Sequence, residues 1–118
     1  MIPFNNRFHG HGSLSYVYKN GDAIRSHLAT IKVIKNDKRK NSRVAVVISK
    51  KVMKSAVRRN LIRRRVYEII QPSLPNLKHV YDIVIIISSG EAYTTPYKEL
   101  SDQINTLLKQ VGVKGIRK

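Results

Sequence analysis

The spacing of hydrophobic and polar positions predicts two β-strands in the first half of the chain. From Leu28 to Ile34, apolar residues alternate with polar ones, which is the period of a strand with one buried face. From Arg43 to Ser49, almost every position is apolar, which predicts a second strand placed more centrally in the sheet. The polar and basic segment between them, Asn36 to Ser42, is predicted to be a hairpin loop.

After Ser49 the period of the apolar positions becomes that of a helix. A helix is expected to begin near Ser55 and to end before Pro72. Its apolar stripe comprises Ile62, Val66, Ile69 and Ile70. Two further helices are predicted, one over residues 13–20, which Gly21 ends, and one over residues 97–111. The core-facing residues of the last helix are Leu100, Ile104, Leu107, Leu108 and Val111.

A third strand, Tyr81 to Ile87, is β-branched at almost every position and is predicted to be buried. The resulting order, α-β-β-α-β-α, indicates an α+β or α/β sandwich with helices over one sheet. The length favours a single domain over residues 1–118. Residues 1–12 are expected to form an extended arm, and residues 112–118 a basic tail.

The charge balance narrows the class of partner. The chain has 23 Lys and Arg against 7 Asp and Glu, a formal net charge of +16, which a protein retains when a phosphate-rich partner offsets it. No aliphatic run is longer than that of Ile83 to Ile87, which is far shorter than the roughly 20 residues that span a bilayer. Cysteines are absent, and no secretory signal is recognised. We therefore expect a cytoplasmic nucleic-acid-binding domain that does not bind membranes.

The basic residues are concentrated at the start of the predicted central helix. The eight basic residues between positions 50 and 65 are Lys50, Lys51, Lys54, Arg58, Arg59, Arg63, Arg64 and Arg65. A solvated basic face is the plain interpretation of such a run. However, this segment contains no acid before Glu68, and each arginine near a helix N-terminus opposes the helix dipole at a cost of up to about 1 kcal/mol. The planar fork of arginine suits phosphate, so the pattern favours a nucleic-acid-binding surface.

The segment from Ser49 to Glu68 resembles the arginine- and asparagine-rich signature of the bacterial ribonuclease P protein subunit. The matching positions are Lys50, Lys51, Arg59, Asn60, Arg63, Arg64 and Glu68. Leu61 stands where the signature usually has an arginine, and Tyr67 replaces its final arginine. Neighbouring Arg58 and Arg65 are expected to supply charge in their place.

The resemblance continues on both sides of this segment. In the N-terminal stretch, the family pattern is matched at Arg7, Val17, Tyr18 and Gly21, with Ser13 and Leu14 at the positions of its Asp-Phe pair. The strand Tyr81 to Ile87 and the final amphipathic helix also have counterparts. The resemblance implies a two-layer α-β sandwich of order α-β-β-β-α-β-α, with a short extra strand near Ala23 to Arg25. It also implies an unusual left-handed crossover through the basic helix.

The family resemblance further implies an activity. In that family, a small basic protein binds a large catalytic RNA and helps it to remove the 5′ leader from precursor tRNA. The holoenzyme is an endoribonuclease whose catalytic centre, with Mg²⁺, lies in the RNA, so no catalytic residue is expected in the protein. The implied partners are the ribonuclease P RNA and the leader, with one monomeric protein for each RNA.

Two groups of site residues follow from the resemblance. The residues expected to bind the RNA subunit are Lys50, Lys51, Lys54, Arg58, Arg59, Asn60, Arg63, Arg64 and Tyr67. The residues expected to bind the leader are Leu14, Tyr18, Lys32, Val44, Val46 and Ile48. Aromatic side chains in a basic groove stack on single-stranded bases, each at about 1–3 kcal/mol. For Tyr18 and Leu14, ordinary packing of a helix on a sheet is the alternative.

Other chemistry finds little support in the sequence. His9 and His11 have the spacing of a metal clip, but no third ligand is near them. Asp82 begins a strand, where it is expected to cap or to pair with a lysine. No paired carboxylates have the arrangement of an autonomous nuclease. A structural RNA-binding protein of the ribosomal type, without a catalytic partner, remains the alternative function.

Overall fold

The computed structural model describes residues 11–35, 42–76 and 80–110, without the side chains of residues 11–15, 73, 75 and 76. Their elements are α1 (His11–Asn20), β1 (Asp22–Arg25), β2 (Ala29–Lys35), β3 (Arg43–Ile48), α2 (Ala56–Ile70), η2 (Gln71–Asn76), β4 (Tyr81–Ile87), η3 (Gly90–Tyr93) and α3 (Tyr97–Gln110). The two η elements are short 3₁₀ helices. The predicted order of helices and strands is confirmed, including the short extra strand, which is β1. The first helix begins at His11, two residues before the predicted start, so residues 11 and 12 do not belong to the predicted extended arm. The rest of that arm, residues 1–10, and the basic tail lie outside the described residues.

The four strands form one sheet in the order β1-β2-β4-β3. β4 pairs with β2 antiparallel and with β3 parallel, so β2 and β3 are not neighbours. The predicted hairpin between β2 and β3 is therefore wrong. The prediction that β3 is more central than β2 is also wrong, since β3 lies at an edge. β3 is apolar throughout because α2 covers one of its faces and the other face is partly buried. It does not have a partner strand on each side.

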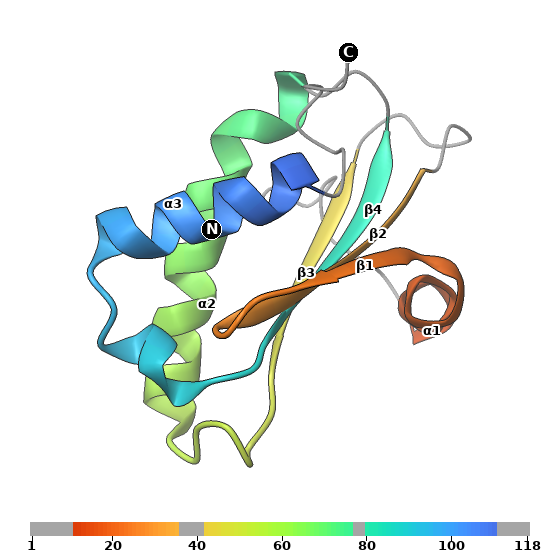
Figure 1. Cartoon of the computed structure of the whole chain (residues 1–118). Coiled ribbons are helices and arrows are strands. Elements are labelled where there is room, and N and C mark those ends of the chain that lie inside the picture. The colour runs from red at the N-terminus through yellow and green to blue at the C-terminus, as the bar shows by residue number, and fades with distance from the viewer. Residues whose placement is uncertain (1–10, 36–41, 77–79, 111–118) are drawn as a thin grey trace.

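The main core lies between one face of the sheet and the pair of helices α2 and α3 (Figure 1). Its fully buried side chains include Ile31 of β2, Ile83 and Ile85 of β4, Ile62 of α2 and Ile104 of α3. All four residues predicted for the apolar stripe of α2 are buried. The stripe of α3 is confirmed for Leu100, Ile104, Leu107 and Leu108, whereas Val111 lies outside the described residues.

Helix α1 packs on the opposite face of the sheet (Figure 1), which we call the α1 face. Val17 is fully buried where α1 crosses β2 and β4. At the end of α1, a Cβ on Gly21 would lie 2.8 Å from the carbonyl oxygen of Val17 and 3.0 Å from that of Val33. Glycine at this position lets the chain turn closely from α1 into β1.

A buried ion pair joins β3 to β4. Nε and Nη2 of Arg43 donate to Oδ1 and Oδ2 of Asp82 at 2.8 and 2.7 Å, and both side chains are about 4% exposed. The two residues are register partners in the parallel ladder. The predicted ion pair of Asp82 is therefore made with an arginine and not with a lysine. Slipping the register would leave two buried charges without each other, which is strongly unfavourable.

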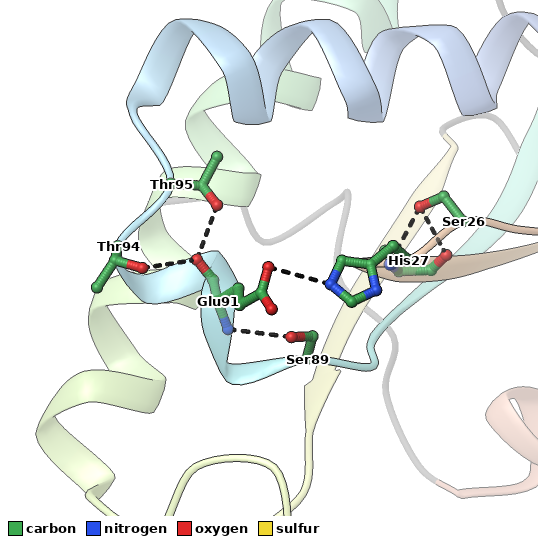
Figure 2. Close-up of polar contacts among 7 residues, drawn as sticks. Ser26, His27, Ser89, Glu91, Thr94 and Thr95 are labelled. Atoms are coloured by element: carbon green, nitrogen blue, oxygen red, sulfur yellow. Dashed lines mark hydrogen bonds and ion pairs between the residues drawn. The ribbon is translucent and has the colours of Figure 1, made fainter.

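The turn between β1 and β2 contacts η3 (Figure 2). Nε2 of His27 lies 3.0 Å from Oε1 of Glu91, and both side chains are about two-thirds exposed. The hydroxyls of Thr94 and Thr95 donate to the carbonyl oxygen of Glu91, and Ser89 Oγ accepts from its N–H. These bonds order both ends of η3, whereas the exposed pair adds little stability.

Candidate nucleic-acid interface

The loop between β3 and α2 is held by its own hydrogen bonds. The carbonyl oxygen of Ser49 accepts from the N–H groups of Val52 and Met53, each at 3.1 Å. Ser55 caps α2, because its Oγ accepts from the N–H of Arg58 at 3.2 Å. Nη1 of Arg59 donates to the carbonyl oxygens of Met53 and Lys54, both at 2.9 Å. These hydrogen bonds give the loop an ordered conformation, and the loop positions the basic residues that it contains.

One flank of α2 faces the edge strand β3. Arg63 donates from Nη1 to Oδ1 of Asn60 at 2.6 Å and from Nε to the carbonyl oxygen of Val46 at 3.5 Å. Tyr67 follows Arg63 by one turn on the same flank and is half-buried. The structure therefore groups Asn60, Arg63 and Tyr67, all predicted to bind RNA, beside β3.

The other flank of α2 faces η3. The guanidinium of Arg58 lies 4.9 Å from the ring centre of Tyr93, and Nη1 of Arg65 donates to the carbonyl oxygen of Tyr93 at 2.9 Å. Leu61 lies between these arginines along the helix, three residues after one and four before the other. Both arginines can therefore supply charge near Leu61. They lie on the opposite flank from Tyr67, so they do not replace an arginine there.

Four basic side chains point into solvent. Lys50, Lys51, Lys54 and Arg64 are exposed, and within the described part of the chain none of their side chains has a hydrogen bond or ion pair. The first turn of α2 contains no acidic residue. From Ser49 to Tyr67, before the exposed Glu68, the loop and α2 thus present positive charge without an acidic residue, with planar arginine groups suited to phosphate.

The α1 face brings together two of the residues predicted to bind the leader. Lys32 Nζ donates to the carbonyl oxygen of Tyr18 at 3.1 Å and lies 5.2 Å from the centre of its ring. Tyr18 is half-buried, whereas its neighbour Val17 is fully buried between α1 and the sheet; neither residue belongs to the main core. The side chain of Leu14 lies outside the part that the structure describes.

The remaining leader-binding prediction needs a correction. Val44, Val46 and Ile48 are only 1%, 6% and 6% exposed and belong to the core beneath α2. They point away from the α1 face, because alternate residues of a strand face opposite sides of the sheet. The residues of β3 on the α1 face are Ala45 and Val47, both half-buried.

Ala45 and Val47 were missed because a uniformly apolar strand shows no alternation. A weak signal existed in Arg43, whose polar side chain is in phase with both. Half-buried Ile86, the register partner of Val47 in β4, lies on the same face and was also missed. Together these three side chains form an apolar surface on the α1 face, where the buried Val84 of β4 lies in register between Ala45 and Lys32.

The described residues contain neither a group of side chains suited to a metal ion nor a helix that could span a membrane. Within residues 11–35, 42–76 and 80–110, no three His, Asp or Glu side chains are grouped so that they could hold a metal ion. His9 lies outside these ranges, and so does the side chain of His11. None of the described helices combines the length and apolarity that crossing a bilayer requires.

Comparison with known proteins agrees with this arrangement. A family model described as Ribonuclease P matches residues 2–112. The ribonuclease P protein component of Pseudanabaena sp. (strain PCC 6903) is 31% identical over 113 residues, covering 96% of this chain and 97% of that protein. The corresponding protein of Clostridium novyi (strain NT) is 33% identical over 98 residues, covering 82% of this chain and 85% of that protein.

Solved structures share the fold at lower identity. The Staphylococcus aureus RNase P protein superposes with a TM-score of 0.81 at 21% identity, covering 92% of this chain and 96% of that one. The Thermotoga maritima RNase P protein superposes with a TM-score of 0.76 at 22% identity, covering 88% and 96%. At these identities the likeness concerns the fold alone.

Proposed function

The chain belongs to the ribonuclease P protein family. From that premise we propose that the loop before α2 and the outer side of α2 bind the RNA subunit, and that the α1 face binds the leader of precursor tRNA. Membership makes it the protein subunit of an endoribonuclease holoenzyme, with the ribonuclease P RNA as its partner. The observation that carries the proposal is the group of exposed basic side chains, Lys50, Lys51, Lys54 and Arg64, on one built surface.

In this proposal the loop before α2 and the outer side of α2 bind phosphates of the RNA subunit. Each neutralised phosphate releases counterions, so the affinity falls with salt, with a slope of about 0.7–0.9 for each contact. The contacts of Arg59 with loop carbonyls give it a positioning role, because it fixes the lysines of the loop. Arg63 and Asn60 extend the same surface toward β3.

The α1 face is the proposed path of the leader. A single-stranded leader offers bases for stacking and phosphates for ion pairing. Tyr18 supplies an aromatic ring, Lys32 a cation beside it, and the half-buried side chains of Ala45, Val47 and Ile86 supply apolar contact. Mature tRNA lacks the leader, so this surface favours the precursor through differential binding.

Mg²⁺ in this proposal is bound by the RNA. The described protein residues lack a suitable group of acidic or histidine ligands, while RNA phosphates are the oxygen ligands that Mg²⁺ takes. The protein then lowers the Mg²⁺ requirement by screening phosphate charge, as one monomer for each RNA. The family match leaves no support for the alternative of a purely structural RNA-binding protein.

The test is precursor-tRNA cleavage at low Mg²⁺ by ribonuclease P RNA from the same source, with and without the protein. The protein should restore cleavage at the mature 5′ end, and more strongly for a precursor with a long leader than for one with a trimmed leader. Tyr18→Ala should abolish that dependence on leader length while leaving RNA-subunit affinity intact. Tyr16→Ala is the matched control, since Tyr16 is 57% exposed on the same helix.

Two results would contradict parts of this proposal. No stimulation of cleavage, despite salt-sensitive binding of RNA, would refute the functional role. Stimulation that does not change with leader length would refute the assignment of the leader to the α1 face.

A further inference from the structure

The basic surface contains an exposed apolar side chain, which cannot bind phosphate. Val57 is 69% exposed, more than any other large hydrophobic residue among those described. It lies in the first turn of α2, three residues after Lys54 and three before Asn60. A single exposed hydrophobic residue is ordinary on a protein surface. One placed among the phosphate-binding residues becomes part of the interface when the partner binds.

A second apolar side chain continues this position along the helix. Leu61 is half-buried and follows Val57 by four residues, so the two lie one above the other on the helix surface with Cβ atoms about 5–6 Å apart. Exposed Arg64 borders the pair on one side, and Arg58 with Arg65 borders it on the other. We call Val57 and Leu61 the apolar strip.

We propose that the apolar strip packs against the face of an unpaired nucleobase of the RNA subunit, while the surrounding basic residues hold the adjoining phosphates. This inference rests on the proposed function of α2. A duplex hides its base faces by stacking, so the strip selects RNA whose base is unstacked and turned outward. Phosphate contacts by themselves position RNA without reading it. The strip therefore adds a preference for a structured RNA with an unpaired base over a plain duplex.

The residue at position 61 supports this assignment. A surface that only neutralises phosphates gains from an arginine there, which is the residue that the family signature usually has. Leu61 removes a charge from the middle of the surface and enlarges the apolar area next to Val57 instead. Because the flanking Arg58 and Arg65 keep the positive charge nearby, the change exchanges one phosphate contact for an apolar one.

Val57→Ala tests the strip without threatening the fold. The side chain is mostly exposed, and alanine is the better helix former, so the melting temperature should stay the same or rise. Affinity for the ribonuclease P RNA should fall at every salt concentration by up to roughly fifteenfold, the loss expected if both removed methyl groups are fully buried in the contact. The slope of affinity against salt should not change. For a duplex without unpaired bases, the affinity of Val57→Ala should equal that of the wild type.

Leu61→Arg tests the same idea in the opposite direction. If the surface binds phosphates alone, this variant binds the RNA subunit more tightly at every salt concentration. The strip predicts a steeper salt slope together with weaker binding at high salt, where the apolar contact contributes most of what remains. Tyr97→Ala, which removes a side chain 48% exposed on α3, is the control and should bind as the wild type does.

The outcomes separate the strip from the function on which it rests. If the wild-type protein shows no salt-dependent binding to the ribonuclease P RNA, the proposed function fails and the strip fails with it. If the wild type binds but Val57→Ala has unchanged affinity, a changed salt slope, or an equal loss on the duplex, the strip alone is refuted. Tighter binding of Leu61→Arg at high salt would also refute it.

Discussion

Helices α2 and α3 contact each other on the same face of the sheet, but their outer surfaces follow opposite charge patterns. α3 carries Glu99 in its first turn and Lys109 in its last, the arrangement that complements the helix dipole. α2 has no acid in its first turn and no base in its last, and Arg58 and Arg59 stand where the dipole opposes them. The outer side of α3 is consistent with folding alone, whereas that of α2 is consistent with binding a polyanion.

The inner sides of the two helices are nevertheless alike. Each buries four aliphatic residues against the sheet. α2 offsets part of its unfavourable charge locally, through the Ser55 cap and through the bonds from Arg59 to the preceding loop. Stability and the proposed RNA binding are therefore assigned to different sides of one helix, so substitutions can separate them.

The largest expected effect is a loss of stability when the buried sides of α2 and α3 are substituted. Ile62→Ala in α2 and Ile104→Ala in α3 should each lower the free energy of unfolding by about 2–5 kcal/mol, because both side chains are at most 1% exposed. Chemical denaturation of the two variants measures this. A loss below about 1 kcal/mol for Ile62→Ala alone would show that α2 contributes much less to the core than α3 does.

The next largest expected effect is a change in RNA binding when the outer sides of α2 and α3 are substituted. The double variant Lys51→Ala/Arg64→Ala should reduce the salt slope of RNA-subunit binding by roughly 1.4–1.8, the contribution of two phosphate contacts. Lys98→Ala/Lys109→Ala removes the same charge from exposed positions of α3 and serves as the matched control. Binding titrations over a range of salt concentrations give both slopes. Equal reductions in the two variants would mean that only net charge matters and that α2 is not the interface.

The smallest expected effect on stability comes from reversing the charge pattern in the first turns of α2 and α3. Ala56→Glu should stabilise the protein by about 0.3–1 kcal/mol at low ionic strength by placing an acid in the first turn of α2, and should weaken RNA binding. Glu99→Gln should destabilise the protein by a similar amount and leave RNA binding unchanged. Thermal unfolding and binding are measured on both variants. If Ala56→Glu binds RNA as tightly as the wild type, the start of α2 lies outside the interface.

Local pattern was sufficient for the helices and for the strand boundaries. The buried stripes of α2 and α3 follow directly from the helical period, and β2, β3 and β4 begin and end within one residue of their predicted positions, whereas β1 was implied only by the family resemblance. The strand order was not accessible in the same way. Pairing of β4 between β2 and β3 depends on contacts between distant segments, and adjacency in sequence wrongly favoured a hairpin.

The residues of the proposed interface could be chosen by residue type, but the partners of their side chains could not be predicted. A guanidinium suits a backbone carbonyl as well as a phosphate, so the sequence could not reveal that Arg59 binds the loop or that Arg65 binds the carbonyl oxygen of Tyr93. The face occupied by Val44, Val46 and Ile48 depends on which side α2 covers, and that choice is made by the tertiary structure. Only the arrangement of the whole sheet identifies Ala45 and Val47 as the residues of β3 on the α1 face.

The position of β4 between β2 and β3 also has a consequence for biosynthesis. Because the ribosome makes residues 81–87 after both neighbouring strands, a nascent chain that ends before Tyr81 has no partner for β3 and none for one edge of β2. Such open edges are sites for pairing with other chains. Chains terminated between α2 and β4 would therefore expose a complete basic helix on an incomplete sheet. These fragments are the ones that we expect to aggregate and to need clearance by proteases.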